Sequence, residues 1–192
     1  MSHSVYRRLM SVDRTQVLRT AATLLSRKAT ATMDEVARAA GIGRATLHRH
    51  FAGRDALVRA LEQMCIEEAE AALDAARIEE GPADEAVRRL VAASEPAAPL
   101  LAFLVTENQL FEGDGQNEGW ARLDARLVAL FRRGQEEGTF RIDLSPAWLC
   151  EAFYGLIGSG AWAVADGRVA ANDFSYMIAE LLLGGARRSV EK

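Results

Sequence analysis

Two short helical patterns joined by a glycine turn place the strongest restriction on how this chain folds. Thr32 and Glu35 have the spacing of a helix capping box, and apolar side chains follow them at helical intervals. This pattern ends after about two turns at Gly41, a residue type that suits the end of a helix because it adopts positive φ without a Cβ clash. A second pattern covers about residues 44–51. Two short helices crossing at such a turn predict a helix-turn-helix unit.

Helical periodicity continues along most of the chain, and no segment alternates convincingly between apolar and polar residues. The nearest approach to a strand, residues 139–144, is short and bounded by Gly138 and Pro146. We therefore predict an all-α fold in two parts, residues 1–54 with the helix-turn-helix unit and residues 55–192, which are helical throughout. The expected helices, about nine, cover residues 13–28, 32–40, 44–51, 55–76, 84–94, 99–111, 120–137, 146–165 and 173–187.

The charge of the chain is divided unevenly. Its 192 residues have a net charge of −4 and a sequence pI of about 5.5, which taken alone argues against a nucleic-acid binder. Residues 1–64, however, hold 11 Lys and Arg against 5 Asp and Glu, a net charge of +6, and the rest of the chain carries −10. A basic segment joined to an acidic one indicates that the first part binds a polyanion and the second has another task.

The second short helix has a polar face suited to DNA. At 100° per residue, Leu47 and Phe51 define its core direction, and Arg49 points about 180° away from it. Ala45, Thr46 and His48 flank Arg49, so this face is predicted to meet base edges in a major groove. Arg44 and His50 lie at the flanks, where phosphates are nearer.

Other classes of protein find little support in the sequence. The longest apolar run, residues 100–105, is far shorter than the ~20 residues that span a bilayer, and no signal peptide is evident, so we expect a cytoplasmic protein without a membrane partner. Cys65 and Cys150 are expected to be buried thiols. His48 and His50 point about 200° apart and cannot grip one metal ion. We find no catalytic constellation, so we expect no cofactor and no enzymatic activity.

The first third of the chain resembles the DNA-binding domain of the tetracycline-repressor (TetR) family. The resemblance covers roughly residues 14–62 and depends on about fifteen ordered positions, within residues 17–25, 32–43 and 46–57. The sequence departs from the family pattern at His48, where tyrosine is common. The resemblance implies an all-α homodimer, usually a repressor, that leaves a palindromic operator in double-stranded DNA when it binds a small molecule.

The resemblance also implies roles for individual residues. Thr32 and Arg54 would bind phosphates, Arg44, His48 and His50 would contact phosphates or the groove, and Ala45, Thr46 and Arg49 would face bases. In the family, the later helices enclose a ligand cavity, and the last two form a four-helix bundle with those of a second copy. The resemblance therefore implies a helix-turn-helix DNA-binding domain over residues 1–54 and a helical ligand-binding and dimerisation domain over residues 55–192. A DNA-binding protein that responds to no ligand is the alternative function, and the effector and the choice between repression and activation stay open.

The acidic part of the chain offers two sets of residues for these tasks. Glycines inside an apolar helical pattern cost about 1 kcal/mol each relative to alanine, which favours a close helix–helix approach. We predict a dimer interface at Gly155, Gly158, Phe174, Met177, Ile178, Leu181 and Leu182, with internal packing as the alternative. A second set has the aromatic and polar character of a cavity for an apolar ligand, although each residue also fits an ordinary core: Phe103, Glu107, Phe111, Trp120, Leu127, Phe131, Phe153 and Trp162.

Overall fold

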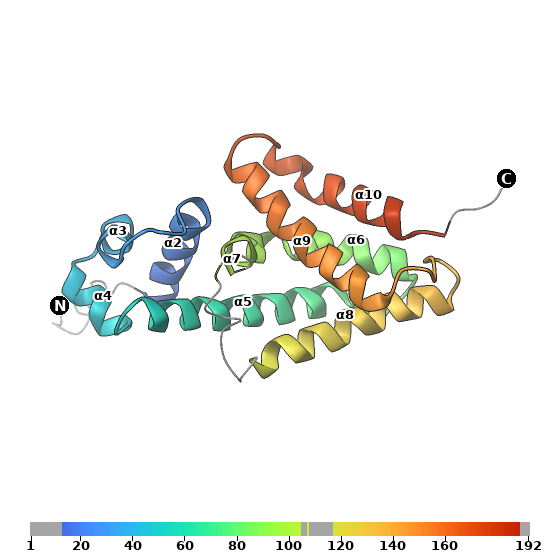
Figure 1. The fold of residues 1–192 in the computed structure, drawn as a ribbon, viewed down its shortest axis with the longest axis horizontal. Coiled ribbons are helices and arrows are strands. Elements are labelled where there is room, and N and C mark those ends of the chain that lie inside the picture. The colour runs from blue at the N-terminus through green and yellow to red at the C-terminus, as the bar shows by residue number, and fades with distance from the viewer. Residues whose placement is uncertain (1–12, 105–106, 108–116, 189–192) are drawn as a thin grey trace, which may run out of the picture. The chain divides into compact units, whose positions relative to one another are not determined.

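The computed structural model describes residues 13–104, 107 and 117–188, and in these ranges the chain is built from nine α-helices and two short 3-10 turns (Figure 1). It divides into two compact units, residues 1–63 and 64–192, and the division falls inside the helix α5. The predicted all-α fold is confirmed. Within the described ranges the nearest thing to a strand is an isolated antiparallel bridge between Phe140 and Arg187, which involves the segment whose sequence came closest to a strand.

The first unit contains three helices and the start of a fourth, close to the predicted ranges. They are α2 (Arg14–Arg27), α3 (Met33–Ala39), α4 (Arg44–His50) and the beginning of α5 (Arg54–Ala76). The Asp13 side chain caps α2 by accepting a hydrogen bond from the Thr15 amide, and Thr32 caps α3. Apolar side chains of all four helices are buried, including Leu18, Val36, Leu47 and Leu57.

The second unit holds the remainder of α5 and five further helices: α6 (Ala83–Ala93), α7 (Ala98–Leu104), α8 (Glu118–Glu136), α9 (Pro146–Ala165) and α10 (Phe174–Ala186). The helix α9 packs against α7, α8 and α10, and α6 packs against α8 and α10 (Figure 1). The helix expected over residues 99–111 is seen as α7, and most of its later residues lie outside the described ranges. Among the described residues, no helix has both the length and the apolar character needed to cross a bilayer.

The C-terminal end of α5 is held by arginines from two other helices. Arg77 follows the helix with a positive φ of 46°, and Arg89 of α6 donates to the carbonyl oxygens of Ala76 (2.8 Å) and Glu80 (2.7 Å). Arg133 of α8 donates to the Ile78 carbonyl at 2.6 Å. The bond to Ala76 satisfies a carbonyl that the end of α5 leaves without an intrahelical partner, and the bonds to Ile78 and Glu80 tie the α5–α6 connection to α8 and α6.

The C-terminal part of α5 and the residues after it are also paired with α8 through charged side chains. Arg122 lies 3.1 Å from Glu70, and Arg126 lies 2.7 Å from Asp74 and 2.9 Å from Glu79. Near one end of this pair, a Cβ on Gly119 would stand 2.6 Å from Ile66, so the glycine permits the two helices to approach closely.

Candidate nucleic-acid interface and helical body

The helix α3 begins with the predicted capping box. Thr32 Oγ1 accepts a hydrogen bond from the Glu35 amide at 3.3 Å, and Glu35 Oε2 accepts one from the Thr32 amide at 2.8 Å. Glu35 also forms an ion pair with Lys28 at 2.6 Å. The hydrogen bond from Lys28, together with that from the Thr32 amide, lowers the pKa of Glu35 to about 2. The start of α3 is thus fixed by local bonds, and the Thr32 amide already donates to the Glu35 carboxylate.

The turn between α3 and α4 has the conformation expected from its glycines. Gly41 has a φ of +67°, in the region that favours glycine, and the Ile42 amide donates to the Ala37 carbonyl at 3.0 Å. The core direction predicted from Leu47 and Phe51 is confirmed, since both are buried; the same core includes the buried Val36 and Ala37 and the half-buried Ile42. This core holds α4 against α3 and leaves one side of α4 in solvent.

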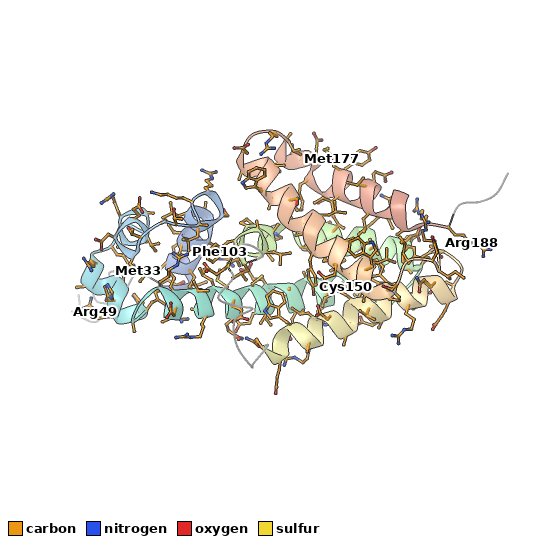
Figure 2. All side chains as sticks on the ribbon, in the orientation of Figure 1. Met33, Arg49, Phe103, Cys150, Met177 and Arg188 are labelled. Carbon is orange, nitrogen blue, oxygen red and sulfur yellow. The ribbon has the colours of Figure 1, made fainter. Side chains whose placement is uncertain are left out.

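The solvent side of α4 presents the residues singled out from the sequence. Arg44, Ala45, His48 and Arg49 are exposed, Thr46 is half-buried beside them, and these five residues are called the α4 face below. Arg49 projects into solvent (Figure 2), and its Nη2 donates to Thr46 Oγ1 at 3.0 Å. Arg44 lies 3.3 Å from Asp34 of α3. His50 is half-buried and its ring tilts against Phe51.

Arg54 lies in a different setting from the arginines of the α4 face. It is half-buried at the first position of α5, and its guanidinium donates to the carbonyl oxygens of Ala31 (3.1 Å) and Ala29 (2.8 Å). Both acceptors belong to the connection between α2 and α3. Arg54 therefore joins the start of α5 to the residues that precede Thr32.

Residues predicted to line a ligand cavity occupy several environments in the second unit. Phe103, Leu127, Phe131 and Phe153 are buried, and Trp120 and Glu107 are half-buried. Phe131 packs against Phe140, with ring centroids 5.9 Å apart. Trp162 is instead 50% exposed, with the Arg168 guanidinium 4.2 Å from its ring centroid. Phe111 lies outside the described residues.

Sequence reasoning missed a polar cluster between α8 and α9. The Tyr154 hydroxyl donates to Asp124 Oδ1 at 2.9 Å, and Cys150 Sγ lies 4.0 Å from the same oxygen. Burial raises the pKa of both groups, that of Cys150 to about 12 and that of Tyr154 well above its ordinary value. Trp120 meets the Tyr154 ring edge-on, with centroids 6.3 Å apart. The i, i+4 spacing of Cys150 and Tyr154 gave no hint of a carboxylate thirty residues away from the tyrosine.

The glycines and apolar residues predicted for a dimer interface divide between the two sides of α9 and α10. Phe174, Ile178 and Leu182 are buried within the chain, as is Gly158, while Gly155, Met177 and Leu181 are exposed. A close approach of α9 and α10 occurs at Gly160, where a Cβ would stand 2.6 Å from Ile178 Cδ1. No neighbour within the described chain comes within 4 Å of a Cβ placed on Gly155.

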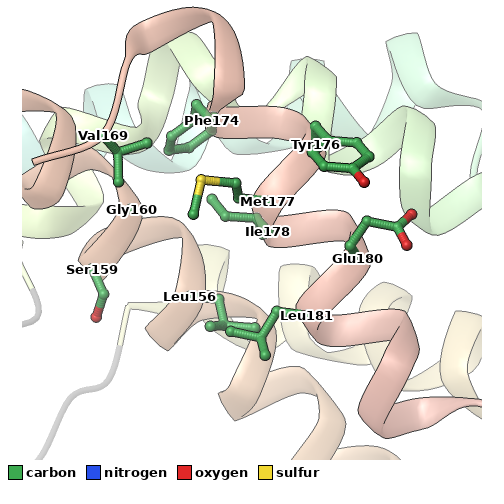
Figure 3. Close-up of a pocket in the computed structure, with 10 residues that line it drawn as sticks. All are labelled: Leu156, Ser159, Gly160, Val169, Phe174, Tyr176, Met177, Ile178, Glu180 and Leu181. Carbon is green, nitrogen blue, oxygen red and sulfur yellow. The ribbon is translucent and has the colours of Figure 1, made fainter.

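A groove of about 570 Å³ lies along these two helices (Figure 3). Its walls include Leu156, Gly160 and Val169 from the region of α9, and Met177 and Leu181 from α10. Tyr176 also borders it and is 68% exposed. Large apolar side chains that stand together in solvent are typical of protein–protein contacts and of ligand-binding grooves.

Known proteins are similar to this chain in both sequence and fold. The family model described as "Bacterial regulatory proteins, tetR family" matches residues 17–61. The transcriptional regulator NfxB of Pseudomonas aeruginosa is 34% identical over 158 residues, covering 81% of this chain and 84% of NfxB. The transcriptional repressor LfrR of Mycolicibacterium smegmatis is 30% identical over 154 residues, covering 80% of each protein.

A crystal structure of LfrR from Mycobacterium smegmatis in complex with proflavine superposes with a TM-score of 0.71. It is 27% identical and covers 92% of this chain and 97% of LfrR. The agreement therefore extends beyond the helix-turn-helix unit through the helices of the second unit. The chain belongs to the TetR family of bacterial transcriptional regulators.

Proposed function

We propose that this protein is a repressor that binds a palindromic operator as a homodimer and leaves it when a small molecule binds. Residues 1–54 form the DNA-binding domain in this proposal, and residues 55–192 bind the ligand and the second copy. The observation that carries it is the α4 face, on which Arg44 and Arg49 stand in solvent on a short helix held by a buried core. The name of LfrR as a repressor supports repression.

In this proposal, α4 enters a major groove with Arg49, Thr46 and Ala45 toward base edges. The hydrogen bond between Arg49 and Thr46 holds the guanidinium over the outer side of the helix, and an arginine fork suits the O6 and N7 atoms of guanine. Arg44, His48 and His50 would contact phosphates or the groove edge, and Thr32 would face a phosphate at the start of α3. Two such units on one dimer would read half-sites about 34–36 Å apart.

The second copy is proposed to pack on α9 and α10. Trp162, Tyr176, Met177 and Leu181 are each at least 49% exposed, and the groove beside them is apolar along most of its length. Gly155 has no side chain, and no described residue lies within 4 Å of a Cβ placed there, so a helix of the second copy could approach α9 closely at this position. Phe174, Ile178 and Leu182 support this surface from beneath, since they are buried within the chain.

The ligand is proposed to bind among the interior aromatic residues of the second unit, close to Tyr154 and Asp124. A carboxylate bordered by Trp120 and Tyr154 suits a planar aromatic cation, through charge and through contact with ring faces and edges. LfrR has been crystallised with proflavine, a ligand of this chemistry. A ligand that favours the form unable to bind DNA needs a coupling of only about 1–3 kcal/mol to act as an inducer.

Selection of duplexes from a random-sequence pool, followed by titration with proflavine, tests the proposal. We expect the protein to enrich a palindrome and to release it as proflavine is added. Failure to enrich any sequence would contradict sequence-specific binding. Enrichment that no small molecule reverses would favour the alternative, a DNA-binding protein that responds to no ligand.

A further inference from the structure

Arg54 links two parts of the first unit that are distant in sequence. Its Nη2 donates to the Ala29 carbonyl at 2.8 Å and its Nη1 to the Ala31 carbonyl at 3.1 Å. The acceptors lie 25 and 23 residues earlier in the chain, in the connection that leads from α2 into α3. Hydrogen bonds from a charged donor are stronger than those between neutral groups, so this fork fixes the connection firmly.

The connection that Arg54 holds is the one that sets the start of α3. Ala31 directly precedes the capping residue Thr32, is almost fully buried, and donates its amide to the Lys28 carbonyl at 2.9 Å. Lys28 in turn pairs with Glu35, whose carboxylate accepts from the Thr32 amide. The Arg54 guanidinium therefore holds the residues before Thr32, and the capping box holds Thr32 and Glu35 directly after them.

Among the described residues, Arg44 and Arg49 of the α4 face donate to side chains and to no backbone carbonyl. Arg44 contacts Asp34 with both side chains largely in solvent, and Arg49 contacts only the neighbouring hydroxyl of Thr46 among the bonds described. Either can swing toward a phosphate or a base without uncovering a backbone carbonyl. Arg54 is already held by two carbonyl oxygens, one of them on a buried residue, and swinging these two donors to a phosphate would uncover both oxygens.

We propose that Arg54 is a positioning residue for DNA binding, which acts by fixing the α2–α3 connection and the start of α3 and makes no phosphate contact itself. This inference rests on the proposed operator binding by α3 and α4. It reassigns the role that the family resemblance implied for this position. The geometry of the donors, two nitrogens directed at two carbonyls of the protein, carries the reassignment.

Salt dependence separates the two roles. Each phosphate that a protein neutralises contributes about 0.9 to the slope of log Kobs against log salt concentration. Loss of a phosphate contact therefore lowers both the affinity and the magnitude of the slope. Displacement of α3 lowers the affinity but leaves the slope nearly unchanged, because the number of neutralised phosphates stays the same. A residue that is only structural would lower the midpoint of thermal unfolding and leave the affinity of the folded protein as it was.

The experiment compares R54Q, R54K and R44Q with the wild-type protein on a duplex that the wild type has selected from a random pool. We expect R54Q and R54K to bind on the order of tenfold more weakly at every salt concentration, with wild-type slopes, the size that follows from losing one charge-assisted hydrogen bond. R44Q is the matched control for an exposed cation and should lower the slope by about 0.9. Wild-type affinity and slope in R54K, with a slope lowered by about 0.9 in R54Q, would overturn the inference.

A second measurement needs no DNA. In R54K, amide hydrogen exchange at Ala31 and Glu35 should become faster than in the wild type, while exchange in the middle of α2 should stay the same. Unchanged exchange at Ala31 and Glu35 would overturn the inference even if R54Q failed to fold. If the wild type selects no duplex at all, the proposed function fails, and the exchange result still decides whether Arg54 holds the connection.

Discussion

The hydroxyl of Tyr154 on α9 and the carboxylate of Asp124 on α8 are joined by a hydrogen bond of 2.9 Å. The bond ties together two helices that also pack along their apolar sides, and it places a carboxylate beside Trp120 and Tyr154. Cys150 lies one helical turn before Tyr154 and is buried against the same oxygen. This pair is therefore both a link between helices and the most polar part of the proposed ligand region.

Removing the Tyr154 hydroxyl should weaken ligand binding and spare DNA binding. In Tyr154→Phe the Asp124 carboxylate loses its donor, so we expect the free energy of unfolding to fall by about 1–3 kcal/mol and the affinity for proflavine to fall, while operator affinity without ligand stays the same. Denaturant titration and proflavine fluorescence measure these quantities. Tyr176→Phe is the control, because Tyr176 is exposed on α10 away from Asp124, and the variant keeps the ring that the proposed surface for the second copy would use. Equal proflavine affinity in both variants would exclude the Tyr154 region as the ligand site.

Arg49 should determine which bases are preferred. We expect Arg49→Ala to relax the preference at one position in each half-site by about 1–3 kcal/mol, since a bidentate contact to a base is lost. Competition binding with single-base variants of the selected duplex measures this preference. Arg59→Ala removes the same charge from an exposed position on α5 and should leave the preference unaltered. A uniform loss across all duplexes in Arg49→Ala would instead identify Arg49 as a phosphate contact.

A charge placed in the groove of α9 and α10 should separate the dimer. Leu181 is 65% exposed in the single chain, so Leu181→Glu should fold, but its carboxylate would be buried unpaired against the second copy. Sedimentation velocity is expected to give a dimer for the wild type and a monomer of about half that mass for Leu181→Glu. Ile142→Glu changes a residue that is 83% exposed and lies outside this groove, and it should remain dimeric. A monomeric wild type would disprove the proposed interface.

The first unit should lose stability in acid through Glu35. Its pKa in the folded protein is lowered from 4.5 to about 2, so its contribution is complete above pH 4.5 and declines as the pH falls from 4.5 toward 2. Thermal melts between pH 6 and about pH 3 should therefore show a steeper loss for the wild type than for Glu35→Gln, which keeps a capping acceptor without the charge. Parallel curves for the two proteins would show that the ion pair with Lys28 adds nothing to folding.

The sequence predicted the first unit well because its structure is determined locally. The capping box at Thr32, the left-handed Gly41 and the core positions Val36 and Leu47 each depend on residues within a few positions of one another. Periodicity also placed the bounds of α9 and α10 to within about a residue. Such local signals can be read from the sequence because they do not depend on how distant parts of the chain pack.

The second unit was harder to predict because α9 and α10 carry apolar residues on more than one side. Periodicity cannot tell which side faces the chain when both are apolar, so it did not separate the buried Ile178 from the exposed Met177 and Leu181. Periodicity likewise gave no sign that Trp162, which is predicted to line a cavity, is 50% exposed in the single chain. The Asp124–Tyr154 bond depends on how α8 and α9 pack against each other, and the sequence pattern of either helix alone does not indicate that packing.

The arginine bonds at the C-terminal end of α5 hold that end of the helix in place. Arg89 and Arg133 anchor the residues that follow Ala76, and α5 has 23 residues, so its length is about 34 Å. Tilting a rod of this length by about 5° about its fixed end moves the other end by about 3 Å. In the proposed mechanism, a ligand that tilted α5 by this small angle would displace Arg54 by a distance comparable to the length of a hydrogen bond.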